Sequence, residues 1–301
     1  MTLSCLHTHT TFCDGTADVE TMCETAFARG FSSVGFSAHA PLTKKMGIKT
    51  DWVMHEEKLE EYIDSVLAAR RRWNGKLAVF LGMEVDFIQG ITSPADPDIQ
   101  ALPLDYILGT VHYSISPKNG EPFNIDEYPE NFCKVMEEYG NDGRAICEAY
   151  YHSYGSMIAV GGYDILAHLD LVKKNNDRFR FFSQDDTWYK NLLVKTADLI
   201  VSAAGKAGVN GKTGGQMPVV EVNTGGINRG YCTEPYPSLY ALKLLKERNI
   251  PLVVTADAHA PDHLGKSYEK AVETMRQAGI SSAALLERQE NGSAGWREEP
   301  L

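Results

Sequence analysis

A short stretch near the start of the sequence combines residue types that bind metal ions. Residues 6–15 read LHTHTTFCDG, with His7 and His9 two positions apart at the end of a short apolar run. In an extended strand, residues two apart point to the same side, so these two imidazoles can share one ion. Asp14 follows, and Gly15 permits a tight reversal that returns the carboxylate to the histidines. Such a mixed nitrogen and oxygen set suits zinc, manganese or iron.

The other candidate ligands follow short strand-like runs further along the chain. Glu84 comes after the run at 77–82, with Asp86 on the same face two residues later. Asp257 and His259 repeat the two-residue spacing after a later run, and three further histidines stand at strand ends: His39, His112 and His168. Burying so many imidazoles together without metal ions or other partners is costly, which favours a metal site with more than one ion.

Seven strand-like runs recur, mostly separated by helix-like segments. They cover residues 3–6, 33–37, 77–82, 106–111, 163–167, 218–223 and 251–255. Strands alternating with helices indicate an α/β fold with a parallel sheet, and reactive residues at the C-terminal strand ends are typical of a (β/α) barrel. An open doubly wound sheet also binds ligands at strand ends. We favour the barrel because ligand candidates follow nearly every strand, and only a closed ring brings them all together.

The segments between the strands have simpler interpretations. Helices are expected at 18–29, 56–73, 129–160, 188–206 and 264–278, the third being one long helix or a pair. Turn residues at 117–128 indicate a loop on the substrate side. The glycine-rich stretch at 208–215 lacks the spacing of a phosphate loop and precedes a strand, so we interpret it as a flexible connector.

Composition excludes several classes of protein. The 301 residues are 43% hydrophobic and 23% charged, as in ordinary globular proteins, and no apolar run approaches the roughly 20 residues of a membrane span. A net charge of -11 argues against nonspecific nucleic-acid binding. The six cysteines form no CxxC pair and indicate reduced thiols, and no secretory signal is visible. We therefore expect a cytoplasmic protein.

Seven motifs together resemble the motif series of the polymerase and histidinol phosphatase (PHP) family, in its histidinol-phosphatase branch. In order, they are HTHTTFCDG, FSAHAP, GMEVDF, GTVHY, ILAHLDLV, EVNTGG and TADAHAPDHLG. The resemblance spans about residues 3–265. It implies a distorted (β/α)7 barrel with the metal site at the C-terminal ends of the strands. Residues 1–288 would form this single domain, and 289–301 a polar C-terminal tail.

The resemblance also implies three divalent metal ions, zinc, manganese or iron, and assigns their ligands. The first ion would take His7, His9, Glu84 and Asp257; the second Glu84, His112 and His168; and the third Asp14, His39 and His259. One departure is visible: the family often has an acidic residue before the second-motif histidine, and here that residue is Ala38. Support of His39 by a neighbouring carboxylate is therefore in question.

The activity implied by the resemblance is hydrolysis of a small phosphorylated substrate, L-histidinol phosphate, in histidine biosynthesis. Metal ions that lower the pKa of water and neutralise phosphate oxygens make a covalent phosphoenzyme unnecessary. Asp257 or His259 is expected to protonate the leaving group. Arg229 is the expected phosphate clamp, because a guanidinium can hold two phosphate oxygens.

Further candidates for substrate contact are less specific. Lys173 follows the fifth motif, and His263 lies near the end of the seventh. Asn223 shares a strand face with Glu221, and one of the two is expected to orient the substrate amine or a metal ligand. The imidazole end of the substrate has several possible neighbours in the site loops: Phe12, Phe87, Tyr113 and Asn223.

Two alternatives stand beside this hypothesis. The same site would serve a PHP-type phosphoesterase that acts on another small phosphate ester or a nucleotide. A chain that uses the metal only as a binding scaffold is the non-enzymatic alternative. Structural zinc sites are usually closed by four ligands, several of them cysteines. The candidate set here is larger and consists of histidine, aspartate and glutamate, which favours catalysis.

Overall fold

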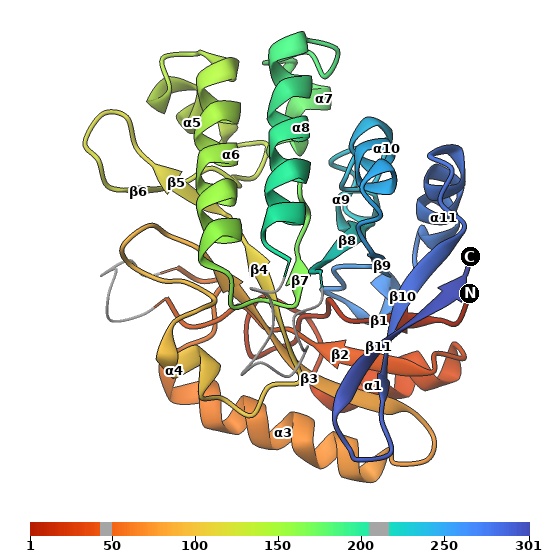
Figure 1. The fold of residues 1–301 in the computed structure, drawn as a ribbon. Coiled ribbons are helices and arrows are strands. Elements are labelled where there is room, and N and C mark those ends of the chain that lie inside the picture. Colours follow the sequence, from red (N-terminus) through yellow and green to blue (C-terminus); the bar gives the residue numbers. More distant parts are fainter. Residues whose placement is uncertain (43–49, 205–216) are drawn as a thin grey trace.

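A sheet of seven parallel strands forms the centre of the molecule (Figure 1). The structure is a computed structural model that describes residues 1–42, 50–204 and 217–301. The strands lie in the order β1 (Ser4–Cys5), β2 (Ser33–Phe36), β3 (Ala78–Asp86), β4 (Tyr106–Thr110), β7 (Ile165–Leu166), β8 (Val219–Asn223) and β9 (Leu252–Thr255). Each of the seven predicted runs overlaps one of these strands, and β3 continues past the predicted end at residue 82 to Asp86.

The two edge strands meet at their C-terminal ends. Just beyond β1 and β9, Thr8 and Ala258 form a parallel bridge. The His9 N–H donates to the Ala258 carbonyl at 2.8 Å, and the Ala258 N–H donates to the His7 carbonyl at 3.0 Å. The sheet is therefore a nearly closed barrel, as the sequence predicted, and the first and last metal-ligand motifs are neighbours.

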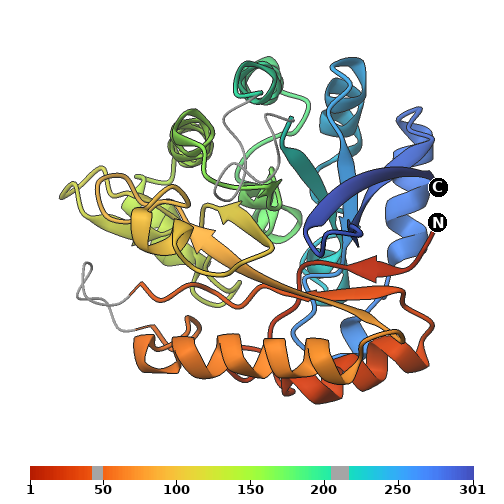
Figure 2. The same cartoon turned by 60° about the horizontal axis from the view of Figure 1, so that its bottom comes forward.

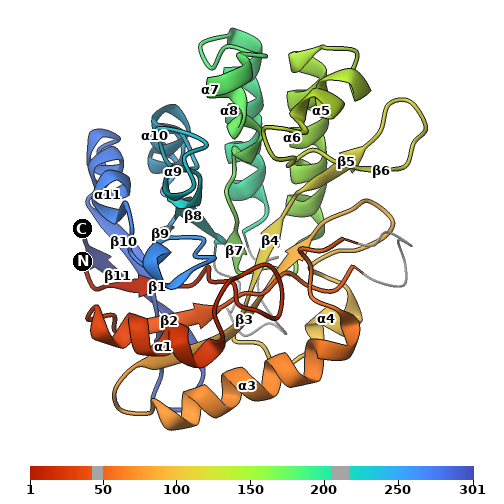
Figure 3. The same cartoon turned by 180° about the vertical axis from the view of Figure 1, so that it is seen from behind.

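Helices surround the barrel (Figures 2 and 3). The longer ones are α1 (Val19–Ala28), α3 (Leu59–Arg72), α6 (Gly143–Val160), α8 (Thr187–Ser202), α10 (Leu239–Glu247) and α11 (Tyr268–Gln277). Shorter ones are α4 (Pro97–Gln100), α5 (Phe132–Glu138), α7 (Asn176–Phe179) and α9 (Gly225–Asn228). The segment expected at 129–160 is thus the pair α5 and α6. In the described part of the chain, no helix is both long and apolar enough to span a membrane.

Apolar side chains fill the inside of the barrel below the strand ends. Leu6, Phe80 and Leu108 belong to one buried cluster there. A two-stranded antiparallel hairpin, β10 (Ser282–Arg288) and β11 (Ala294–Pro300), covers the cluster, with Leu286 and Trp296 packed against it. The barrel interior is therefore filled at its N-terminal end, and the predicted ligands lie at the C-terminal end, where sites of such barrels are usually found.

The prediction of a polar tail at residues 289–301 needs correction. Most of this segment is β11, paired over its whole length with β10. Its end is fixed to the start of the chain, because the Thr2 N–H donates to Glu299 Oε1 at 2.6 Å. The polar composition arises because a hairpin at the edge of a barrel keeps one face exposed to water.

Of two other predicted segments, one differs from its prediction and the other lies outside the described residues. The segment expected as a loop at 117–128 contains β6 (Pro122–Asn124), which pairs with β5 (Tyr113–Ile115) directly after β4. This hairpin projects beyond the C-terminal end of the barrel. The glycine-rich stretch at 208–215 lies outside the described residues.

Candidate metal centre

All nine predicted metal ligands converge at the C-terminal end of the barrel. Their side chains form overlapping groups in which the ligand atoms lie within 4.8 Å of one another. These groups are His9, Asp14, His39 and His259; His7, Glu84 and His168; His7, His9 and Asp257; and His39, Asp86 and His112. The shared members make one continuous cluster. The barrel thus brings together residues that lie up to 252 positions apart in the sequence, from His7 to His259.

Glu84, near the end of β3, lies at the centre of the cluster. Its carboxylate contacts nitrogen atoms of five imidazoles: His7 (3.1 Å), His9 (3.5 Å), His39 (3.1 Å), His112 (3.7 Å) and His168 (3.1 Å). Burial alone would raise the pKa of this carboxyl group, but the surrounding imidazoles hold the pKa well below its usual range. The group is therefore ionised and placed to bridge cations.

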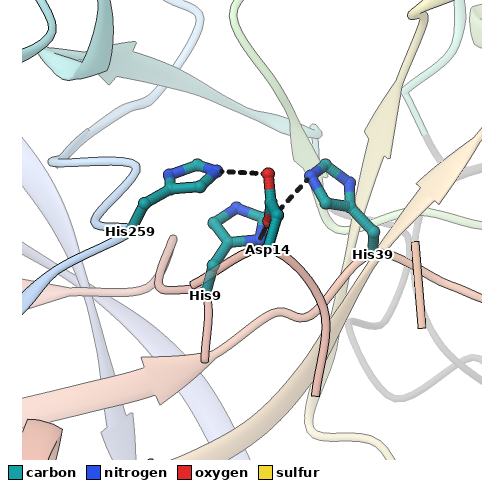
Figure 4. A group of neighbouring side chains, drawn as sticks. All are labelled: His9, Asp14, His39 and His259. Carbon is teal, nitrogen blue, oxygen red and sulfur yellow. Dashed lines mark hydrogen bonds and ion pairs between the residues drawn. The ribbon is translucent and has the colours of Figure 1, made fainter. Parts of the chain in front are cut away.

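Asp14 forms the second part of the cluster, at its more open edge (Figure 4). Its oxygens lie 3.1 Å from His259 Nε2 and 3.8 Å from His39 Nε2. The loop that carries Asp14 folds tightly against the strand end, since a Cβ on Gly15 would come within 2.4 Å of the Thr10 nitrogen. Only glycine fits beside Asp14 without a clash. The chain reverses tightly here, as the sequence indicated.

Asp257 links the cluster to Arg229. One carboxylate oxygen lies 3.3 Å from His9 Nε2 and 3.7 Å from His7 Nε2, and the other accepts a hydrogen bond from Arg229 Nη2 at 2.8 Å. The backbone of Asp257 has φ 49° and that of His168 has φ 22°. Residues other than glycine seldom occupy this left-handed region, and where they do, the strain is commonly found at functional sites.

Two buried carboxylates outside the predicted set orient the histidines. Asp86 lies 3.1 Å from His112 Nδ1 and accepts its backbone N–H at 2.8 Å. Glu221 lies 2.7 Å from His7 Nδ1 and accepts the His168 N–H at 3.0 Å. A carboxylate at Nδ1 favours the tautomer that leaves Nε2 free to bind a metal. The spacing of Asp86 from Glu84 was a usable signal for the first of these pairs.

His39 is held differently, as the departure at Ala38 suggested. Ala38 is buried and cannot supply a carboxylate. Instead, the ring of Trp52 packs edge-on against His39 with their centroids 4.7 Å apart. Trp52 thus packs against the His39 ring, while Glu84 rather than residue 38 places a carboxylate 3.1 Å from His39 Nδ1.

The cluster fits metal ions by a test independent of the motifs. Four of its buried polar atoms form no hydrogen bond among the described residues: His9 Nε2, Asp14 Oδ1, His39 Nδ1 and His168 Nδ1. Leaving such atoms unsatisfied costs about 1–3 kcal/mol each. Divalent ions between the carboxylates and imidazoles would satisfy them, and imidazole with carboxylate is a donor set that zinc, manganese and iron accept.

A cavity of about 830 Å³ opens directly above the cluster. Glu84, His112 and His168 lie in its floor. Its walls include Trp52, Tyr113, Glu127, Lys174, Arg229 and Tyr231. The cavity is large enough for a small organic phosphate, and the metal ligands are accessible from it.

The structure separates the predicted substrate-contact residues into two groups. Arg229 and Tyr113 line the cavity, whereas Asn223, His263, Phe12 and Phe87 are absent from its lining. Asn223 instead donates to Glu221 at 2.5 Å, and Glu221 in turn contacts His7, one of the predicted metal ligands.

Lys173 also lies away from the cavity. It is buried, with its ammonium 3.2 Å from Asp170 and 3.0 Å from Glu234. The adjacent Lys174 lines the cavity in its place. The short 3₁₀ turn at Leu171–Lys173 directs Lys174 to the cavity and Lys173 into the protein interior. The sequence motif alone does not predict this turn.

This fold and site define a barrel protein with a cluster of candidate metal ligands beneath an open cavity. Residues 6–206 match the PHP domain, and the chain belongs to this family. It is 27% identical over 283 residues to a probable histidinol-phosphatase of Deinococcus radiodurans, covering 94% of this chain and 96% of that protein. It is also 27% identical over 278 residues to the histidinol-phosphatase of Bacillus subtilis, covering 89% and 97%.

A solved structure has the same fold. It is the histidinol phosphate phosphatase of Lactococcus lactis in complex with zinc, L-histidinol and phosphate. The TM-score is 0.65 at 18% identity, covering 94% of this chain and 95% of that one. At this identity the match supports the barrel architecture described above.

Proposed function

We propose that the protein is a histidinol-phosphatase that hydrolyses L-histidinol phosphate to L-histidinol and phosphate, a step of histidine biosynthesis. The observation that carries the proposal is the convergence of nine ligands under one cavity whose wall also holds Arg229. The substrate comes from the relatives, which carry this name and match nearly the whole chain.

Three divalent ions, zinc, manganese or iron, are part of the proposal. His7, His9, Glu84 and Asp257 would hold the first, Glu84, His112 and His168 the second, and Asp14, His39 and His259 the third. When bound, such ions lower the pKa of water and neutralise phosphate charge. Zinc in the Lactococcus lactis structure supports this choice of chemistry.

Arg229 is suited to position the phosphate. Its guanidinium lies beside the cluster, with Nη1 3.2 Å from His259 Nδ1 and Nη2 on Asp257. The side chain is one-quarter exposed and faces the cavity. A fixed guanidinium fork can hold two phosphate oxygens, and Lys174 adds a second positive charge to the same cavity.

Of the two candidate acids for the leaving alkoxide, Asp257 is the poorer one, and His259 would serve only when it is not bound to the third ion. Although burial favours a protonated carboxyl at Asp257, Arg229 and the neighbouring imidazoles hold its pKa well below the usual range. A carboxylate in that state is a poor proton donor. His259 lies at the more open edge of the cluster, where it can reach a departing oxygen.

We also propose that the protein acts in the cytoplasm and binds no nucleic acid. All six cysteines are free thiols, which suits a reducing compartment. The net charge of -11 opposes phosphate-backbone binding.

A substrate panel tests the proposed activity. We expect kcat/KM for L-histidinol phosphate to exceed that for generic phosphomonoesters and nucleotides by at least about a hundredfold, the range that specific contacts provide. Glu84→Gln, purified in the same way, controls for contaminating phosphatases. Equal turnover of all the esters would reject the substrate and favour a phosphoesterase of broader specificity.

A further inference from the structure

The cavity above the metal cluster is chemically different on its two sides. Near His259 and Asp257, the wall carries positive charge, since Arg229 and Lys174 both pack against the ring of Tyr231, at 5.7 Å and 4.9 Å from its centroid. The lining also includes two aromatic rings near His39 and His112, those of Trp52 and Tyr113, and one further lysine, Lys134. A bound molecule would therefore meet a cationic side and an aromatic side.

Trp52 and Tyr113 form the aromatic side. Their rings stack with centroids 5.9 Å apart and planes 19° from parallel. Trp52 also stands edge-on to His39 and to His112, with centroid distances of 4.7 Å and 5.4 Å. Held by three rings, the indole offers a fixed flat surface directly beside the floor of the cavity, and such surfaces bind planar rings well.

Glu127 adds an available negative charge to this side. Strand pairing places Asn124 opposite Tyr113, and Asn124 Nδ2 lies 3.4 Å from Glu127 Oε1. That long contact is the only hydrogen bond of the Glu127 carboxylate among the described residues, and no cation pairs with it there. Its neighbour Asp126, in contrast, is neutralised by Lys174 at 2.8 Å. A carboxylate that lines a cavity and has no cationic partner of its own is suited to bind a cationic group of a ligand.

We infer that Trp52, Tyr113 and Glu127 form the subsite for the organic end of the substrate. The subsite selects phosphomonoesters that carry a flat heteroaromatic ring and an ammonium group, with the ring on Trp52 and the positive charge on Glu127. The inference rests on the proposed function, because it assigns the phosphate to the metal cluster and Arg229. It goes further by naming the residues that distinguish this substrate from other phosphate esters.

Charge removal at Glu127 is the first test. In Glu127→Gln, we expect KM for L-histidinol phosphate to rise about tenfold with kcat nearly unchanged, as for loss of a binding interaction equal in the ground and transition states. Hydrolysis of phenyl phosphate, which has a ring but no positive charge, should not change. Glu130→Gln, an exposed acid three residues away, is the matched control and should behave as the wild type.

Ring removal at Trp52 is the second test. Trp52→Leu should raise KM for both L-histidinol phosphate and phenyl phosphate, but not for glycerol 2-phosphate, which has no ring. Metal content and thermal unfolding of each variant verify that the cluster under Trp52 is intact. Equal changes for all three esters, with metal retained, would overturn the role of the indole.

Inhibition by the product L-histidinol separates this inference from the proposed function. With phenyl phosphate as the reporter, Glu127→Gln should weaken inhibition by L-histidinol about tenfold. Unchanged inhibition and unchanged KM would overturn the subsite while leaving the phosphatase activity in place. A wild-type enzyme without preference for L-histidinol phosphate would instead reject the proposed function, and the inhibition measurement would still decide whether the subsite exists.

Discussion

The two ends of the barrel both bury carboxylates, but with different partners. At the N-terminal end, Asp105 accepts hydrogen bonds from Arg288 at 2.6 Å and 2.7 Å, from Arg70, and from the Leu81 N–H at 2.8 Å. Protein cations and donors satisfy this group completely. At the C-terminal end, Glu84 is surrounded by imidazoles, and several buried atoms of the cluster form no hydrogen bond within the described parts of the chain.

The difference separates stability from function along the barrel axis. The ion-pair cluster around Asp105 is complete in the protein itself and holds the β10–β11 hairpin against the strands. Under the proposed function, the C-terminal cluster would be complete only with ions bound, so its contribution to stability would depend on their concentration. Changes at the two ends should therefore have different consequences.

Metal removal should have the largest effect. We expect a chelator to abolish phosphatase activity and to lower the melting temperature, because an ion at a thousand times its Kd stabilises the folded state by about 4 kcal/mol. Activity assays and calorimetry, with elemental analysis of the same samples, measure both effects. Full activity in metal-free protein would contradict the role of the cluster.

Loss of the central carboxylate should come next. In Glu84→Gln, kcat/KM should fall about a thousandfold, as when a central electrostatic group of an active site is removed. Metal content should fall with it, whereas circular dichroism should stay unchanged. Retention of all ions by this variant would show that Glu84 does not hold them.

Loss of a supporting carboxylate should have an intermediate effect. Asp86→Asn should weaken metal affinity about 10- to 100-fold, the usual cost of losing a carboxylate behind a histidine ligand. Competition with a chromophoric chelator measures the affinity. Glu121→Gln, at an exposed acid in the turn before β6, is the control.

The contact between Asp86 and His112 should make the stability of the metal-free protein depend on pH. In the metal-free protein, burial opposes protonation of His112, but Asp86 outweighs it and raises the pKa of His112 to about 9 from 6.5. The stability contributed by this pair is therefore complete below pH 6.5 and is lost as the pH rises through about 9. Urea unfolding of metal-free protein should show this loss, and Asp86→Asn should remove it. A stability that rises over this interval would contradict the assignment.

A change at the other end of the barrel should have the smallest effect on activity. Arg288→Met should lower the free energy of unfolding by roughly 1–3 kcal/mol, because Asp105 keeps only part of its hydrogen bonding. Metal affinity and kcat/KM should stay within about twofold of the wild type, since neither end shares residues with the other. Urea unfolding measures the change in the free energy of unfolding, and steady-state kinetics measure kcat/KM. A large loss of activity would show that the ends are coupled.

The floor of the site could be predicted because strand ends determine where residues lie. Once seven parallel strands form a barrel, residues such as His112 and His168 must meet at one end, whatever the intervening chain does. The walls could not be predicted in the same way. Glu127 reaches the cavity through the β5–β6 hairpin, whose strands are only three residues long and leave little pattern in the sequence.

The β10–β11 hairpin at the N-terminal end of the barrel was also not predictable from the local sequence. Residues of β11 are largely polar, and only pairing with β10 makes them a strand. Such pairing depends on tertiary contacts, including those of Trp296 with the barrel interior, rather than on local propensity. The choice between Lys173 and Lys174 similarly depends on one short turn.

Anomalous scattering from crystals grown with phosphate tests the central claim most directly. Peaks of divalent metals grouped around Glu84, with phosphate between them and Arg229, are the predicted result. No metal peaks at the strand ends, or single ions at sites that share no ligands, would contradict a polynuclear centre built from these nine residues.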